Sequence, residues 1–85
     1  MWEVRLGREA EKTLKRLMPE IKERVLTALA KLRSNPFPIG IEKLKTTNEW
    51  RLRVGDYRII YRVDEKRRIV EVSEIGHRRD VYRGR

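Results

Sequence analysis

Residues 50 to 61 read WRLRVGDYRIIY, and this stretch decides the fold. Two alternating segments flank Gly55-Asp56, a dipeptide of the kind that closes a two-residue β-hairpin. With that dipeptide as the loop, the hairpin has a single register. The predicted pairs are Val54 with Tyr57, Arg53 with Arg58, Leu52 with Ile59, Arg51 with Ile60 and Trp50 with Tyr61.

Side chains alternate along a strand, so this hairpin separates into an apolar face and a cationic face. The apolar face carries Trp50, Leu52, Val54, Tyr57, Ile59 and Tyr61, and the cationic face carries Arg51, Arg53, Arg58 and Arg62 around Ile60. Like charges that face each other destabilise a sheet, so the pair of Arg53 and Arg58 predicts an anionic ligand. The alternative is a solvated outer surface, although such surfaces normally mix both signs of charge. Arginine favours the first interpretation because its guanidinium binds phosphate oxygens in a bidentate manner.

Composition limits the classes of function. The chain has 85 residues, which predicts a single domain over residues 1–85, and it contains no cysteine and therefore neither disulfides nor a thiolate metal site. Its net charge is +9, which favours nucleic acid or an acidic protein as partner. No apolar run is long enough to span a membrane and no signal peptide is evident, so we expect a cytoplasmic protein.

The N-terminal half predicts one strand and two helices. Trp2, Val4 and Leu6 alternate with charged residues, which indicates a short strand that ends at Gly7. A first amphipathic helix has the apolar stripe Ala10, Leu14, Leu17 and Met18, and a second begins at Pro19 with the stripe Ile21, Val25, Ala28, Leu29 and Leu32. The expected fold class is α+β, in which the N-terminal strand and the helical hairpin pack on one face of a small, mainly antiparallel sheet.

Residues 34–49 read as an irregular segment, because Asn35-Pro36 ends the second helix. We expect four apolar residues to anchor it, namely Phe37, Ile39, Ile41 and Leu44. Lys43 and Lys45 lie just before the hairpin. They either extend the cationic face or are simply solvated.

Residues 69–75 predict a third strand. The expected register places Tyr61 opposite Val70, Ile59 opposite Val72, Arg58 opposite Ser73, Arg62 opposite Ile69 and Ile60 opposite Glu71. Glu71 is then the one carboxylate on the cationic face. The segment after this strand brings His77, Arg78, Arg79 and Tyr82 toward the neighbourhood of Arg58, and the three residues after Tyr82 leave no room for a C-terminal helix.

These residues fit cleavage of RNA without a metal. Such a reaction needs a base for the 2′-hydroxyl, an acid for the leaving 5′-oxygen and cations for the phosphorane. Arg51, Arg53, Arg58 and Arg78 meet the third requirement. For proton transfer, His77 is the natural candidate because it is the only histidine of the chain, whereas Tyr82 would need nearby arginines to favour its ionised form. One histidine without an acidic cluster is a poor ligand set, so we expect no metal or other cofactor.

The order of these segments, and above all LRVGDYRIIY at residues 52–61 and GHRRDVY at residues 76–82, resembles the RelE/ParE superfamily of toxins from type II toxin–antitoxin systems. The second motif favours the RelE branch. RelE-like toxins are α+β proteins that enter the ribosomal A site and cleave mRNA there without a metal, and a RelB-like antitoxin neutralises them. The resemblance therefore implies three partners, an antitoxin in a hetero-oligomer, the ribosome and mRNA.

The resemblance also implies roles for individual residues. Arg51 and Arg53 match the two basic residues on the strand before the turn, Arg58 the arginine after it, Arg78 the arginine after the last strand, and Tyr82 the C-terminal tyrosine. We expect these five and His77 to form the catalytic set, and Lys43, Lys45, Arg62 and Arg79 to contact RNA or the ribosome. Two alternatives stay open at this point, a ParE-like toxin that inhibits DNA gyrase without enzymatic activity and a plain RNA-binding module.

Overall fold

The fold is built around a mixed five-stranded sheet. The computed structural model describes residues 1–45 and 47–80 and the backbone of Val81. The elements are β1 (Glu3–Leu6), α1 (Arg8–Arg16), α2 (Pro19–Ser34), β2 (Glu42–Lys43), β3 (Trp50–Val54), β4 (Tyr57–Asp64), β5 (Ile69–His77) and α3 (Arg78–Val81). The strand order is β1-β5-β4-β3-β2, with β1 parallel to β5 and all other neighbours antiparallel. The predicted α+β class is confirmed.

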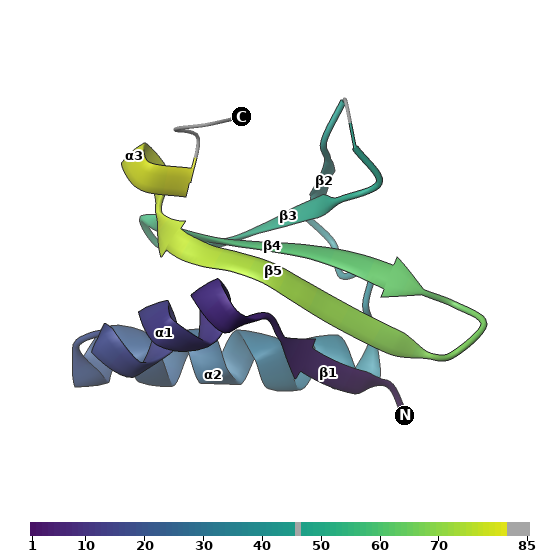
Figure 1. Cartoon of the computed structure of the whole chain (residues 1–85), viewed down its shortest axis with the longest axis horizontal. Coiled ribbons are helices and arrows are strands. Elements are labelled where there is room, and N and C mark those ends of the chain that lie inside the picture. Colours follow the sequence, from purple (N-terminus) through teal and green to yellow (C-terminus); the bar gives the residue numbers. More distant parts are fainter. Residues whose placement is uncertain (46, 82–85) are drawn as a thin grey trace.

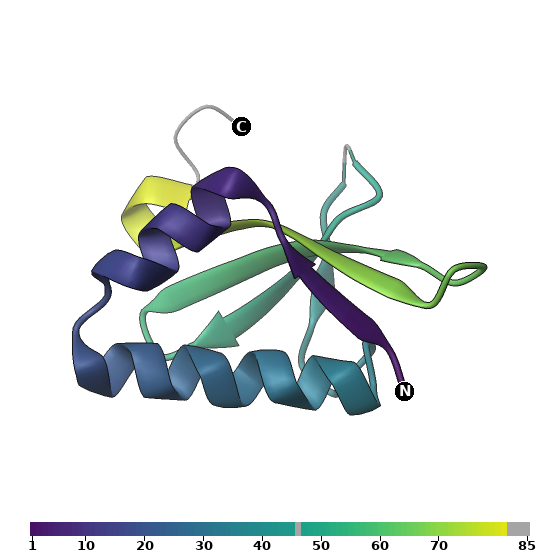
Figure 2. The ribbon, with the colours of Figure 1, turned by 60° about the horizontal axis from the view of Figure 1, so that its bottom comes forward.

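The sheet separates two sides of the molecule. Helices α1 and α2 cover one face, whereas α3 and the β2 region rise from the other (Figure 1). A second view shows α1 and α2 on the same side of the strands, with β1 beside them (Figure 2). None of the helices in the described part of the chain combines the length and the apolar character needed to cross a membrane.

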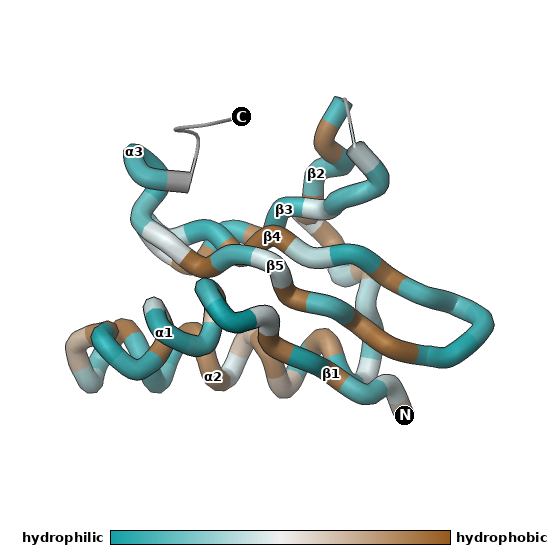
Figure 3. The backbone as a smooth tube through the Cα atoms, in the orientation of Figure 1, coloured by the Kyte–Doolittle hydropathy of each residue, from teal (hydrophilic) through white to brown (hydrophobic). Residues whose placement is uncertain are grey.

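The core lies between the two long helices and the predicted apolar face of the hairpin. Its buried side chains are Ala10, Leu14, Val25, Leu29, Leu32, Ile59, Tyr61, Val70, Val72 and Ile75. Tyr61 is fully buried, and its hydroxyl donates a hydrogen bond of 2.8 Å to the carbonyl of Pro36. Burial raises the pKa of Tyr61 to about 12. Hydrophobic segments alternate with hydrophilic ones along β4 and β5, as expected for strands with one buried face (Figure 3).

The boundary between the two helices follows from Pro19. As predicted, Pro19 is the first residue of α2, where its missing N–H costs no hydrogen bond. Proline pushes the preceding residue into the extended region, and Met18 has a ψ of 147°. Helix α1 consequently ends at Arg16, and Met18 is 70% exposed. The prediction that Met18 belongs to the apolar stripe of the first helix is wrong.

The hairpin of β3 and β4 has the predicted register, from Trp50 opposite Tyr61 to Val54 opposite Tyr57. Gly55 has a φ of +60°, a conformation that a residue with a side chain rarely adopts. Arg53 and Arg58 face each other across the two strands, as the sequence predicts, so two like charges are opposed at this position.

The predicted register of β4 and β5 is wrong. The pairs are Tyr61 with Val72, Arg62 with Glu71 and Asp64 with Ile69, because the loop occupies residues 65–68. The Asp64 carboxylate accepts the N–H of Arg67 at 3.1 Å and so stabilises this loop, in which Arg68 adopts a φ of +58°. A bulge at Ser73 then shifts the register by one residue, so Ile59 pairs with Ile75 and Ile60 with Glu74. The bulge turns Ile75 into the core.

Three features of the chain were not predicted. The segment before the hairpin contains β2, which pairs with Trp50 and Arg51. Ile39 is fully exposed rather than an anchor. Phe37 contacts Trp50 edge-to-face at 5.6 Å between ring centroids but is itself 39% exposed, whereas Ile41 and Leu44 are half-buried. A helical turn, α3, follows β5 directly, and no element was predicted for these residues.

Candidate functional site

The cationic face of the hairpin lies on the side of the sheet opposite α1 and α2. We call this surface the arginine face, and it consists of Arg51 and Arg53 from β3 and Arg58 and Arg62 from β4. Ile60 lies among them and is fully buried. Because α3 and the segment from β2 to β3 both rise on this side, the arginine face is flanked at two of its margins (Figure 1).

Arg58 is the best-fixed cation of this face. Arg58 is only 8% exposed, although it lies on the face of the sheet away from the helices. Its Nη1 donates to the carbonyls of Gly55 at 3.0 Å and Tyr57 at 2.8 Å, which anchors the guanidinium at the hairpin turn. Its Nε is buried and has no hydrogen-bond partner among the described residues. A buried cationic group with an unused donor is suited to an anion.

Carboxylates balance the other arginines of this face. Glu42 of β2 forms ion pairs with Arg51 and with Arg53, the latter at 3.2 Å, and so bridges both arginines of β3. Glu71 lies opposite Arg62 across the strands, and Glu74 lies opposite Ile60. The expectation of Glu71 as the one carboxylate of this face is wrong. No pattern in the sequence predicted Glu42, because its two-residue strand lies in a segment without periodicity.

Glu49 is a buried carboxylate that ties the β2–β3 segment to the sheet. It is 5% exposed, and it accepts hydrogen bonds from the hydroxyls of Thr47 and Ser73, both at 3.1 Å. Arg62 Nε lies 4.0 Å from the same carboxylate. Ser73 is the bulge residue of β5, so the bulge presents its hydroxyl to Glu49. The sequence could have predicted this position of Glu49. If the alternation of Arg53 and Arg51 is extended by two residues toward the N-terminus, Glu49 falls on the arginine face.

His77 does not join the arginine face. It pairs with Tyr57 across the strands, and the two rings meet edge-to-face with centroids 5.6 Å apart. Tyr57 alternates with Arg58, so Tyr57 and His77 lie on the side of the sheet that faces the helices. The expectation that His77 stands with the catalytic arginines is wrong. The bulge at Ser73 reverses the alternation along β5, and the sequence pattern does not reveal it.

The end of β5 nevertheless comes close to Arg58. Gly76 pairs with Arg58, and the backbone N–H of Arg78 donates to the carbonyl of Asp56 at 2.8 Å. This hydrogen bond ties α3 to the hairpin turn, so Arg78 and Arg79 begin beside the turn that anchors Arg58. Both are exposed. The predicted catalytic residue Tyr82 lies outside the described residues.

The two lysines before the hairpin differ in position. Lys43 pairs with Trp50, and its Nζ lies 5.9 Å from the centroid of that ring, which places it on the side of the apolar face rather than on the arginine face. Lys45 is exposed and lines a hollow of about 500 Å³ together with Thr47 and Asn48. Lys43 is also exposed and lines the same hollow.

Comparison with known proteins identifies the family and the fold of the chain. Residues 4–82 match the family described as the ParE toxin of the type II toxin–antitoxin system parDE. The chain belongs to this toxin family. The curated Toxin RelG of Mycobacterium tuberculosis is 30% identical over 82 residues, which cover 94% of each chain. This relative and the solved structures described below place the chain in the RelE branch of the RelE/ParE superfamily.

Two solved relatives are crystal structures of complexes. The archaeal RelE–RelB complex from Pyrococcus horikoshii OT3 matches with a TM-score of 0.81 at 28% identity, over 91% of the toxin described here and 94% of that chain. The RelBE2 complex of Mycobacterium tuberculosis matches with a TM-score of 0.81 at 25% identity, over 89% and 96% of the two chains. The toxin described here therefore shares its sheet and helices with RelE toxins along nearly its whole length.

Proposed function

We propose that this toxin is a metal-independent endoribonuclease that cleaves mRNA in the A site of the ribosome. The observation that carries the proposal is Arg58, buried beside the hairpin turn with its Nε unused among the described residues. Arg53 stands opposite Arg58 and Arg51 lies on the same face, so one phosphate could meet several guanidinium groups. A cluster of this kind stabilises the charge that develops on a phosphorane.

The reaction requires a positioned phosphate, two proton transfers and stabilisation of the charge on the phosphorane. The 2′-oxygen attacks phosphorus as a base removes its proton, and the bond to the 5′-oxygen breaks as an acid protonates that oxygen. We assign Arg58 to the equatorial oxygens of the phosphorane, because its anchored guanidinium needs no reorganisation. Arg51, Arg53 and Arg78 bind and orient the phosphate in this proposal.

Proton transfer falls to groups other than His77, which faces the helices. Glu42 is the described carboxylate that contacts two arginines of β3. It occupies the position in which these arginines would meet a phosphate, so an incoming phosphate would displace the Glu42 carboxylate from them. We propose Glu42 and Tyr82 as the two groups to test for proton transfer.

The remaining cations contribute to binding in this proposal. Arg62, Arg79 and Lys45 are exposed around the arginine face and would contact RNA or the ribosome, which also requires a cytoplasmic location. Contacts of this kind add affinity through release of counterions. Lys43 is a weaker candidate, because its ammonium group lies over Trp50.

We also propose that a RelB-like antitoxin binds this toxin in a hetero-oligomer. The support comes from the two solved relatives, each of which is a RelE-type toxin in complex with its antitoxin. The net charge of +9 predicts an acidic partner.

One observation favours a second candidate, which is inhibition of DNA gyrase. The matching family is described by its ParE toxin, and the ParE-like alternative needs no catalytic arginines. A supercoiling assay with purified gyrase discriminates between the two. Inhibition of supercoiling, with mRNA left intact on ribosomes, would replace the nuclease by this candidate.

The test of the nuclease is primer extension on ribosomes that carry a defined mRNA codon in the A site. We expect cleavage by the wild type and a loss of about 100-fold or more in Arg58→Ala, the scale for removal of one preorganised donor. Tyr82→Phe tests the tyrosine. Arg67→Ala, an exposed arginine in the β4–β5 loop, is the control and should cleave at the wild-type rate. Intact mRNA at every codon tested with the wild type would refute the proposal.

A further inference from the structure

The hairpin turn is the point at which the supports of the proposed active site meet. Arg58 Nη1 donates to the carbonyls of Gly55 and Tyr57. The backbone N–H of Arg78 donates to the carbonyl of Asp56. The three acceptors lie on consecutive residues, so any movement of the turn moves Arg58 and the start of α3 together. The position of the turn therefore decides the position of the proposed catalytic guanidinium.

A cation of the helical layer reaches this turn from the other side of the sheet. Arg24 of α2 is exposed, and both of its terminal nitrogens lie 3.2 Å from the position of a Cβ built on Gly55. The guanidinium thus packs against the glycine, in space that the Cβ of any other residue would occupy. Arg24 also lines a small hollow of about 100 Å³ together with Asp56, whose carboxylate has the opposite charge.

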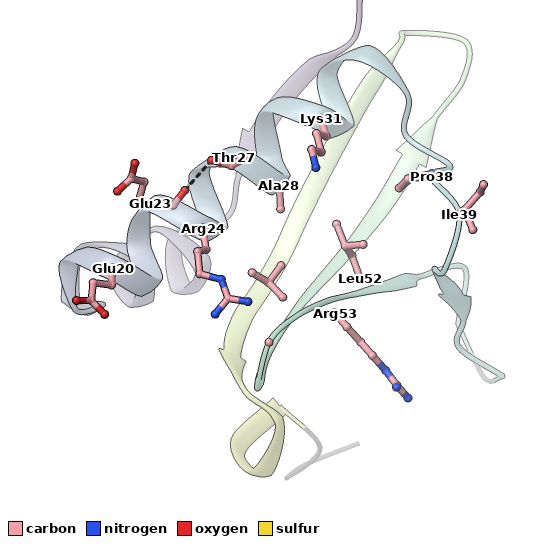
Figure 4. Close-up of a pocket in the computed structure, with 12 residues that line it drawn as sticks. Glu20, Glu23, Arg24, Thr27, Ala28, Lys31, Pro38, Ile39, Leu52 and Arg53 are labelled. Carbon is pink, nitrogen blue, oxygen red and sulfur yellow. Dashed lines mark hydrogen bonds between the residues drawn. The ribbon is translucent and has the colours of Figure 1, made fainter.

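The direction of the Arg24 side chain is informative, because another partner is available on its own helix. Glu20 precedes Arg24 by four residues in α2, a spacing at which opposite charges commonly pair. No ion pair joins Arg24 to Glu20, to Glu23 or to any other described residue. In Figure 4 the guanidinium points toward the hairpin across the groove beside α2, which has a volume of about 740 Å³, whereas Glu20 and Glu23 point in other directions.

The proposed reaction requires a turn that does not move. Gly55 and Asp56 extend beyond Val54 and Tyr57, the last residues that the two strands pair. Such a turn stays fixed only where contacts hold it. Arg58 holds it from the arginine face, and Arg24 contacts it from the side of the helices. Precision matters here, because displacement of a reacting group by about 1 Å costs up to about 100-fold in rate.

We propose that Arg24 is a positioning residue for the nuclease. Its guanidinium packs on Gly55 and attracts the Asp56 carboxylate, and so holds the hairpin turn and, through the turn, Arg58. Arg24 itself contacts no RNA in this proposal. The inference rests on the nuclease function proposed above. It predicts that loss of Arg24 slows the chemical step and leaves RNA affinity unchanged, because the arginine face keeps all of its cations.

The test combines single-turnover primer extension with fluorescence anisotropy of a labelled single-stranded RNA. Arg24→Ala should lower the cleavage rate at saturation about tenfold and leave the dissociation constant for RNA within about twofold. Arg24→Lys keeps a long cationic side chain and should cleave within about threefold of the wild-type rate. The control is Lys31→Ala, which removes an exposed cation from the same helix but not from the hollow at the turn, and it should behave like the wild type.

A second substitution examines the contact with Asp56. Asp56→Asn removes the charge that Arg24 faces and keeps the backbone carbonyl that binds the N–H of Arg78. Asparagine also suits a two-residue hairpin turn. We expect Asp56→Asn to slow cleavage in the wild type and to have no further effect in Arg24→Ala, because both changes remove one interaction. Fully additive effects would contradict an interaction between the two side chains.

NMR follows the guanidinium of Arg58 independently of activity. In ¹⁵N-labelled toxin its Nε–Hε signal should shift or broaden in Arg24→Ala and stay unchanged in Lys31→Ala. An unchanged signal or an unchanged cleavage rate in Arg24→Ala would overturn the proposal. A loss of RNA affinity would also overturn it, because Arg24 would then be a binding residue. If the wild type cleaves no mRNA, the nuclease is refuted, and the Arg58 signal still decides whether Arg24 holds the turn.

Discussion

Replacing Glu42 by glutamine tests whether this carboxylate competes with RNA phosphate for Arg51 and Arg53. Glutamine keeps the size of the side chain and removes the charge that bridges the two arginines. We expect the variant to bind single-stranded RNA more tightly, because phosphate no longer has to displace an anion.

The structure sets the size of this effect. The Glu42 side chain is 47% exposed and that of Arg53 is 61% exposed, so solvent screens their ion pair. Exposed pairs contribute up to about 1 kcal/mol each, which corresponds to roughly fivefold in affinity. The slope of binding against salt should also steepen, because two arginines become available to release counterions.

Fluorescence anisotropy with a labelled single-stranded RNA, over a series of salt concentrations, measures both quantities. The matched control is Glu65→Gln, which makes the same change of charge in the exposed β4–β5 loop. Affinity that is unchanged in Glu42→Gln, or raised equally in Glu65→Gln, would show that Glu42 does not occupy the phosphate position. Primer extension with Glu42→Gln then reports on proton transfer, since tighter binding with slower cleavage separates the two roles.

Three further predictions concern single positions. The His77→Ala variant should cleave mRNA at a rate within about threefold of the wild-type rate in the primer-extension assay, because His77 faces the helices. A loss of cleavage rate near that expected for Arg58→Ala would contradict this geometry. Burial raises the pKa of Tyr61 to about 12, whereas an unfolded tyrosine ionises near 10, so the free energy of unfolding should fall by about 3 kcal/mol as the pH rises from about 10 to 12. Tyr61→Phe should lack this alkaline loss in urea titrations, and identical pH profiles would refute the assignment. Gly55→Ala should lower the free energy of unfolding by about 1–2 kcal/mol because its φ is +60°, and thermal melting at or above the wild-type temperature would argue against that strain.

Two carboxylates connect the β2–β3 segment to the proposed active site. Glu42 and Glu49 hold the β2–β3 segment against the arginine face, the first through arginines of β3 and the second through Ser73 of β5. The groove beside α2 begins at the same strand, β3.

Local pattern determined much of this protein. The Gly55-Asp56 turn and strand alternation specify the hairpin, its register and its two faces from twelve consecutive residues. Pro19 specifies the start of α2, and the apolar stripes of both helices specify the side of the sheet that they cover. These features follow from sequence because each depends on residues a few positions apart, and the arginine face follows with them.

Tertiary structure decided the rest. The register of β4 and β5 depends on the loop at residues 65–68 and on the bulge at Ser73, which is stabilised by burial of Ile75 and by the hydrogen bond to Glu49. That single extra residue reverses the alternation of β5 and so moves His77 away from the arginines. Glu42 reaches Arg51 and Arg53 only because β2 pairs with β3 from a segment without periodicity. Contacts between distant parts of the chain decide which charged side chains become neighbours in the folded protein. Local sequence patterns do not contain that information.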